Sequence, residues 1–128
     1  MARVVRKGNN WIVLVAEDDV GVRNMVRRVL EKTGFQVLAA ADGLEALAFA
    51  YNFPDRIDIL LIDVDMPEIN GISLAEQIKK VRPQILVLAT SGWLQSVRIY
   101  DTEAKILPKP FSMQTLVDSI RALILEAR

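Results

Sequence analysis

Short apolar runs recur along the chain and are separated by mixed polar segments. They are rich in Val, Ile and Leu and do not alternate with polar residues, which is typical of strands buried on both faces of a parallel sheet. The runs are WIVLVA (11–16), FQVLAA (35–40), IDILLI (57–62), ILVLAT (85–90) and the weaker AKIL (104–107).

Between these runs, apolar residues recur at the spacing of a helix face, and the segments carry helix start or stop signals. A capping box and a serine N-cap predict two of the starts, and a glycine and a proline predict two of the ends. The predicted helices are 22–30 (ended by Gly34), 43–51 (opened by Asp42 to Glu45), 72–81 (ended by Pro83) and 113–124 (capped by Ser112).

The stretch from Trp93 to Asp101 predicts one more helix, which we expect to be short or irregular. Leu94, Val97 and Tyr100 form only a narrow apolar stripe, and little chain is left before Lys109. A helix with so few apolar contacts is marginal. We therefore expect the local stability of this segment to be lower than that of the rest of the fold.

Strands and helices alternate without repeats, which predicts an open α/β sheet with helices on both faces. Residues 1–10 are expected to be a flexible, mildly basic arm, and residues 11–128 a single domain. In such sheets, ligands bind beyond the carboxyl ends of the strands. Those ends carry the acids Glu17, Asp18, Asp19, Asp63 and Asp65, the hydroxyls of Thr90 and Ser91, and Lys109.

Carboxylates gathered at one edge repel one another unless a cation lies between them. Mg²⁺ suits oxygen ligands of this kind. We expect Asp18 and Asp63 to bind it directly, Glu17 through a water, and Asp65 through its backbone carbonyl. Asp19 is expected simply to open the first helix, where an acid is favourable.

A phosphate chemistry follows from the same residues. The Asp63 carboxylate can act as a nucleophile toward a phosphoryl group. Positioned cations supply most of the catalysis of such a transfer, and Lys109 fits that role. Ser91, or Thr90 in its place, can donate a hydrogen bond to a phosphoryl oxygen.

Composition removes several other chemistries. The chain has no Cys and no His, which excludes disulfides, thiolate metal sites, a Ser-His-Asp triad and a phosphohistidine of its own. Its 16 basic and 16 acidic residues balance, so no net field favours nucleic acid or an anionic membrane. Neither a targeting segment nor a membrane-spanning run is evident, and we expect a cytoplasmic protein.

The motifs LVAEDD, LLIDVDMPEING, TSG and LPKPF together resemble the receiver domain of two-component response regulators, over residues 11–127. The resemblance implies a flavodoxin-like (βα)5 fold in three layers, with a parallel five-stranded sheet of order 2-1-3-4-5. It also implies that Asp63 accepts a phosphoryl group from a histidine kinase or a histidine phosphotransfer protein. Glu17 and Asp18 match the acidic pair that holds Mg²⁺, and Lys109 matches the lysine that pairs with the phosphoryl group.

Within that resemblance, Ser91 matches the switch hydroxyl because it precedes the small residue Gly92. Receivers often carry an aromatic switch residue three positions before the lysine, where this chain has Ile106. The segment from Ser91 to Lys109 is also shorter than usual. Both departures lie where receivers usually report their state, so we expect loosening or ordering of residues 92–103 to carry the signal.

The resemblance predicts a signalling switch with weak autophosphorylation and autodephosphorylation activity, and a homodimer formed on phosphorylation. Its downstream effector is not indicated. A receiver-like scaffold that does not use phosphorylation is one alternative. A haloacid-dehalogenase-like phosphatase is another, because Asp63-Val64-Asp65 resembles its nucleophile motif, although the acid pair here lies upstream. A flavodoxin is disfavoured because the loop after the first strand is acidic.

Overall fold

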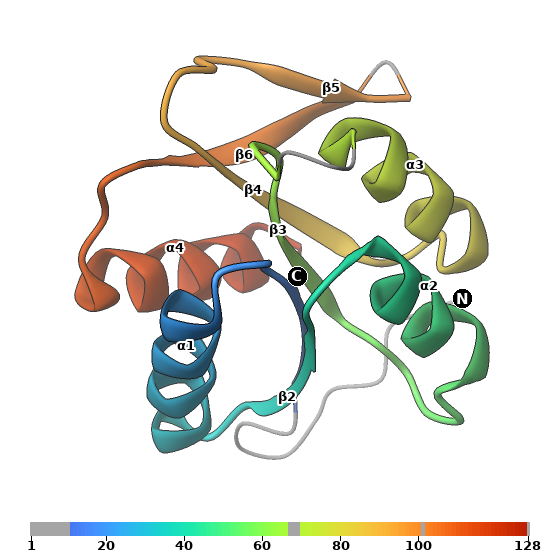
Figure 1. Cartoon of the computed structure of the whole chain (residues 1–128), viewed down its shortest axis with the longest axis horizontal. Coiled ribbons are helices and arrows are strands. Elements are labelled where there is room, and N and C mark those ends of the chain that lie inside the picture. Colours follow the sequence, from blue (N-terminus) through green and yellow to red (C-terminus); the bar gives the residue numbers. More distant parts are fainter. Residues whose placement is uncertain (1–10, 67–69, 101, 128) are drawn as a thin grey trace.

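The computed structural model describes residues 11–66, 70–100 and 102–127, and the predicted arm at 1–10 lies outside them. Strands and helices alternate through most of the chain, as the sequence predicts (Figure 1). In the described ranges, no helix is both long enough and apolar enough to cross a membrane. The elements are β1 (Ile12–Ala16), α1 (Val20–Thr33), β2 (Gln36–Ala40), α2 (Gly43–Asn52), β3 (Ile59–Asp63), α3 (Gly71–Val81), β4 (Leu86–Ser91), β5 (Val97–Ile99), β6 (Thr102–Pro108) and α4 (Met113–Glu126).

The sheet has the order β2-β1-β3-β4-β6-β5. The first five of these strands run parallel, which confirms the predicted 2-1-3-4-5 order, while β5 is an additional antiparallel strand at the edge. Helices α2 and α3 cover one face and α1 and α4 the other (Figure 1). The result is the predicted three-layer α/β fold, and the described residues form one helix fewer than expected.

Side chains on the buried strands alternate between two apolar clusters. Along β1, Ile12 and Leu14 pack toward α2 and α3, whereas Val13 and Val15 pack toward α1 and α4. This explains why the strands are apolar throughout instead of alternating, because each face is covered. The exception within the IDILLI run is Asp58, which is buried but accepts a hydrogen bond from the Ile12 backbone N–H at 2.8 Å and pairs with Arg56 at 3.4 Å.

The helix starts use the predicted capping residues. The Asp42 carboxylate accepts a hydrogen bond from the Glu45 N–H at 2.8 Å, and Glu45 reaches back to the Ala41 N–H at 2.7 Å. Asp19 accepts from the Val22 N–H at 3.0 Å, which confirms that it opens α1. Gly34 ends α1 with φ 105°, a conformation that favours glycine.

The predicted helix between Trp93 and Asp101 is wrong. Residues 97–99 form β5 instead, which pairs with the start of β6 as a β-hairpin; Asp101 lies outside the described residues. Val97 and Ile99 are buried on one side of β5 while Arg98 between them is exposed. A helix would bury the narrow Leu94-Val97-Tyr100 stripe, whereas the strand buries two β-branched side chains and pairs its backbone with β6.

Tyr100 joins this hairpin to α3. Its φ of 51° places it in the turn after β5, its hydroxyl donates to the Glu76 carbonyl at 2.8 Å, and its N–H donates to a Glu76 carboxylate oxygen at 3.2 Å. The hairpin therefore contacts α3 directly, and its buried residues belong to the apolar cluster on the α2 and α3 side of the sheet.

The hairpin predicts a stability pattern that a helix would not give. Ile99→Thr should lower the free energy of unfolding by about 1–3 kcal/mol, because a hydroxyl replaces buried apolar surface. Arg98→Thr, the exposed neighbour, should change it by less than about 0.5 kcal/mol. Urea denaturation of both variants tests this. Equal effects at the two positions would contradict the alternating burial of β5.

Candidate functional site

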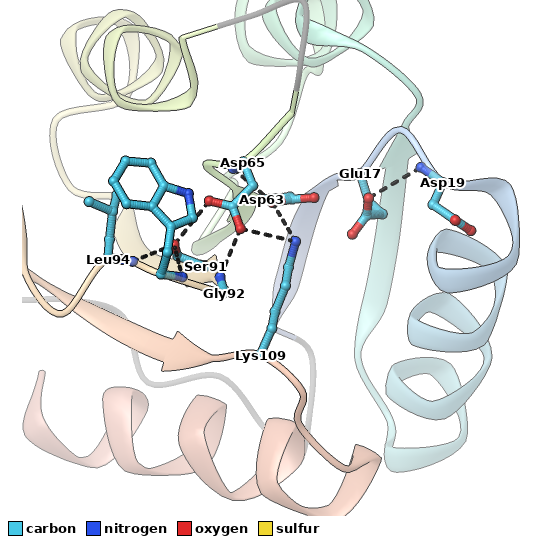
Figure 2. A network of polar contacts seen from close by, with 9 residues as sticks. Glu17, Asp19, Asp63, Asp65, Ser91, Gly92, Leu94 and Lys109 are labelled. Carbon is cyan, nitrogen blue, oxygen red and sulfur yellow. Dashed lines mark hydrogen bonds and ion pairs between the residues drawn. The ribbon is translucent and has the colours of Figure 1, made fainter.

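Four strand ends bring the predicted polar residues to one edge of the sheet. Glu17 and Asp18 follow β1, Asp63 ends β3, Ser91 ends β4, and Lys109 follows β6. The parallel register pairs Asp63 with Thr90, and the Lys109 N–H donates to the Ser91 carbonyl at 2.8 Å. Residues far apart in the sequence are thus held side by side by backbone pairing (Figure 2).

Asp63 is buried, and Lys109 compensates its negative charge. Its Oδ1 accepts a hydrogen bond from the Lys109 Nζ at 2.8 Å and another from the Asp65 N–H at 2.9 Å. The Asp63 side chain is 7% exposed and that of Lys109 31%. A buried carboxylate is costly without such compensation, and the lysine supplies it.

Lys109 faces more than one carboxylate. Burial lowers its pKa, but the hydrogen bond and charge of Asp63, together with the charges of Asp65 and Glu17, outweigh this effect and raise the pKa above its ordinary value. The lysine therefore stays protonated at neutral pH and offers a fixed positive charge at the acidic edge.

Glu17, Asp18 and Asp63 gather their carboxylates within 4.8 Å of one another. Burial is the main cause that raises the pKa of Glu17 from 4.5 to about 7, and the neighbouring Asp63 and Asp18 raise it further against the hydrogen bond from the Asp19 N–H. Three carboxylates this close, with one of them partly protonated near pH 7, form a donor set that suits a hard divalent cation.

Arg23 was not predicted from the sequence. Its guanidinium donates to the Glu17 carbonyl at 2.9 Å and to the Asp18 carbonyl at 3.3 Å. These bonds hold the backbone that presents the acid pair. The sequence places Arg23 one turn into the helix that follows the acid pair, and it gives no other signal of this role.

The side chain of Asp65 also has a role that was not predicted from the sequence. Its carboxylate accepts hydrogen bonds from the Ser91 hydroxyl at 2.9 Å and from the Gly92 N–H at 2.8 Å, and lies 3.5 Å from the Lys109 Nζ. Burial raises its pKa, but these bonds, that of Gly92 foremost, hold the pKa of Asp65 below its usual range. The predicted role of the Asp65 carbonyl as a metal ligand stays a prediction.

The loop that carries Asp65 is held close to α3. A Cβ added at Gly71, the first residue of α3, would lie 2.5 Å from the Val64 Cα. Only glycine allows that approach. The Asn-Gly pair that opens α3 therefore fixes where the chain turns after Asp63.

A cleft of about 680 Å³ opens beside the acidic cluster. Its polar wall is formed by the acids and Lys109, and its apolar wall by side chains of α1 and of the segment after β6. The lining residues are Glu17, Asp18, Asp19, Val22, Met25, Asp63, Lys109, Pro110, Phe111 and Met113. Ile106 lies away from it, half-buried on β6, and lines a smaller cleft with Ser91 and Trp93.

The family of the chain follows from comparison with known proteins. A family described as "Response regulator receiver domain" matches residues 13–121, nearly the whole of the described region. The chain belongs to the response regulator receiver family. It is a receiver domain of the kind found in two-component systems, and the acidic cluster of Glu17, Asp18 and Asp63 is consistent with the family's phosphorylation site.

Among individual proteins, the receiver is 34% identical to the sensor kinase CckA of Brucella abortus (strain 2308) over 116 residues, which are 88% of this chain and 12% of that protein. It is 33% identical to the transcriptional regulatory protein CpxR of Escherichia coli (strain K12) over 115 residues, which are 88% of this chain and 48% of that protein. The chain therefore spans half or less of the length of these relatives.

Solved structures agree with the fold. The receiver domain of the hybrid histidine kinase CckA superposes with a TM-score of 0.76 at 35% identity, covering 88% of this chain and 97% of that one. The chemotaxis response regulator CheY4 of Vibrio cholerae gives 0.76 at 26% identity, covering 90% of this chain and 99% of that one.

The raised pKa of Glu17 predicts a pH-dependent stability of the metal-free receiver. Because the folded-state pKa of about 7 exceeds the ordinary 4.5, the contribution of Glu17 is fully favourable below about pH 4.5 and is lost as the pH rises through about 7. Glu17→Gln should remove that loss. Urea denaturation in the presence of a chelator should show the wild type losing stability relative to the variant over this pH range.

The matched control is Glu31→Gln, which removes an exposed carboxylate of α1. Its stability should follow the wild-type pH profile. If Glu17→Gln follows that profile too, burial of the Glu17 carboxyl does not control the stability.

Proposed function

We propose that this receiver accepts a phosphoryl group on the Asp63 carboxylate from a phosphohistidine of a histidine kinase or a histidine phosphotransfer protein, and acts as a phosphorylation-controlled switch. The observation that carries the proposal is the buried Asp63 carboxylate bound to Lys109 at 2.8 Å beside a cluster of acids. These 128 residues contain no histidine, so the phosphohistidine that donates the group lies outside them.

The transfer uses the two oxygens of Asp63 differently. Oδ1 is bound by Lys109 and by the Asp65 N–H, so attack through Oδ2 leaves both contacts in place. A bond forms between this oxygen and phosphorus as the phosphorus–nitrogen bond of the donor breaks, and the electron pair leaves with the imidazole. Lys109, bound to the other oxygen of the same carboxylate, then offers its positive charge to the phosphoryl group.

The acid cluster fits a magnesium ion. Glu17, Asp18 and Asp63 would hold it, with Asp18 and Asp63 as direct ligands and Glu17 acting through a water. When bound, Mg²⁺ would neutralise negative charge on the carboxylates and on the phosphoryl oxygens. Lys109 would contribute the other positive charge, and Ser91 a hydroxyl donor.

The cleft next to the acids suits a helical donor. Val22 and Met25 on α1 are 37% and 54% exposed, and with Phe111 and Met113 they form an apolar wall beside Asp63. An apolar helix face packed there would bring its histidine to the carboxylate without entering the sheet. Phosphorylation-dependent homodimer formation and a cytoplasmic location stay predictions.

The test is phosphorylation by a small phosphodonor, such as acetyl phosphate, with Mg²⁺. The wild type should gain one base-labile phosphoryl group, detected as a mass increase of the intact protein. Asp63→Asn should abolish it, because an amide is not a nucleophile. The control is Asp55→Asn, which replaces an exposed acid and should leave labelling unchanged. Asp58 would not serve as a control because it is buried. Equal labelling of Asp63→Asn and wild type would contradict the proposal.

A further inference from the structure

The Asp65 carboxylate contacts two parts of the proposed phosphorylation site: the end of β4, at Ser91 and Gly92, and Lys109 after β6. Its Oδ1 accepts from the Ser91 hydroxyl at 2.9 Å, and its Oδ2 accepts from the Gly92 N–H at 2.8 Å and lies 3.5 Å from the Lys109 Nζ (Figure 2). The side chain is 20% exposed, so water reaches it only in part. Both carboxylate oxygens are therefore directed to the end of β4.

The Ser91 hydroxyl is in turn the centre of the turn that leads to the hairpin. It accepts hydrogen bonds from the Trp93 N–H at 3.3 Å and from the Leu94 N–H at 3.0 Å. Leu94 packs against the apolar cluster that contains Val97 and Ile99 of β5. The hydroxyl oxygen thus fixes the backbone of residues 91–94, while its proton is bound to Asp65.

A serine hydroxyl carries one proton to donate. When that proton is donated to Asp65, it cannot be donated at the same time to a phosphoryl oxygen on Asp63. Asp65 and a phosphorylated Asp63 are therefore competing acceptors for the same group. Hydrogen bonds to charged acceptors are the strong ones, so the competition has a measurable effect.

We propose that Asp65 is a positioning residue: its carboxylate competes with the phosphoryl group for the Ser91 hydroxyl, and so holds Ser91 and the turn that it fixes in the unphosphorylated arrangement. This inference rests on the proposed phosphorylation of Asp63. It gives Asp65 a side-chain role beyond the backbone carbonyl expected of it. Removing the carboxylate should make the phosphorylated arrangement easier to reach.

The experiment measures the affinity for beryllofluoride, which mimics a phosphoryl group on Asp63, at fixed Mg²⁺. Four proteins are compared: the wild type, Asp65→Ala, Ser91→Ala and the double variant. Removing the Asp65 charge near an anionic ligand raises affinity by itself, and it does so whether or not Ser91 is present. Only the competition for the hydroxyl requires Ser91.

Asp65→Ala should raise the affinity for beryllofluoride by a factor that is about tenfold larger with Ser91 present than in the Ser91→Ala background. A difference of about tenfold is what the loss of one charge-assisted hydrogen bond is expected to give. Asp65→Asn keeps the shape and one acceptor oxygen but removes the charge, and should give a smaller Ser91-dependent gain. Asp19→Asn is the matched control. It removes a charge from the cleft that Asp63 lines, keeps a good N-cap and does not touch Ser91, so its effect should be equal in both backgrounds.

Equal gains from Asp65→Ala in the two backgrounds would overturn the positioning role and leave the proposed function intact. Failure of the wild type to bind beryllofluoride would instead overturn the proposed function, and this inference with it. The two failures are distinguishable because the second is seen before any variant is compared. Thermal melts of the four proteins verify that each is folded, and Asp65→Asn answers the question if Asp65→Ala is not.

Discussion

The contact between Asp63 and Lys109 determines much of the architecture around the site. A carboxylate that is 7% exposed at the end of a buried strand needs a positive charge within hydrogen-bond distance, and Lys109 supplies it at 2.8 Å from the far side of β4. That distance depends on the parallel register of β3, β4 and β6, which aligns the ends of strands separated by dozens of residues. The order of the strands therefore also determines whether the charge of Asp63 is compensated.

The same lysine is surrounded by more negative charge than it can balance. Glu17, Asp18, Asp63 and Asp65 all lie near it or near one another, and Glu17 responds by binding its proton more tightly. The metal-free site is thus under electrostatic strain that a divalent cation would relieve. Metal binding, protonation of Glu17 and phosphorylation of Asp63 would all act on one shared charge balance.

The hairpin gives this receiver a different edge from the one its sequence first indicates. β5 extends the sheet where a helix was expected (Figure 1). Tyr100 attaches it to α3 through hydrogen bonds to Glu76. Ser91, at the end of β4, contacts both the site, through the Asp65 carboxylate, and the turn that leads to this hairpin, through the Leu94 N–H. A change at Asp63 therefore has a short route to the surface formed by β5 and β6.

Most of the fold and of the site could be predicted from local sequence patterns, whereas the hairpin and the direction of the Asp65 side chain depend on tertiary contacts. Continuous apolar runs predict parallel strands, and parallel strands place their ends together, so Glu17, Asp18, Asp63 and Lys109 followed directly. The hairpin did not, because Leu94-Val97-Tyr100 has helical spacing while Val97-Ile99 alternates within the same residues. Pairing with β6 favours the strand over the helix, and the periodicity of the sequence does not show which segments pair.

The Asp65 carboxylate was missed for a related reason. Its direction depends on the turn after β3, which Gly71 holds against Val64 at a distance that only glycine permits. The sequence shows two acids two residues apart, and it does not show that one of them turns toward Ser91. Arg23 was missed likewise, because its partners are backbone carbonyls.

The most direct measurement is chemical mapping of the phosphorylated residue. The receiver would be treated with acetyl phosphate and Mg²⁺ and then reduced with borohydride, which converts an aspartyl phosphate to homoserine. Peptide mass spectrometry should find homoserine at position 63 and aspartate unchanged at positions 18 and 65. Homoserine at either of those positions, or at none, would contradict the assignment of Asp63 as the phosphoryl acceptor.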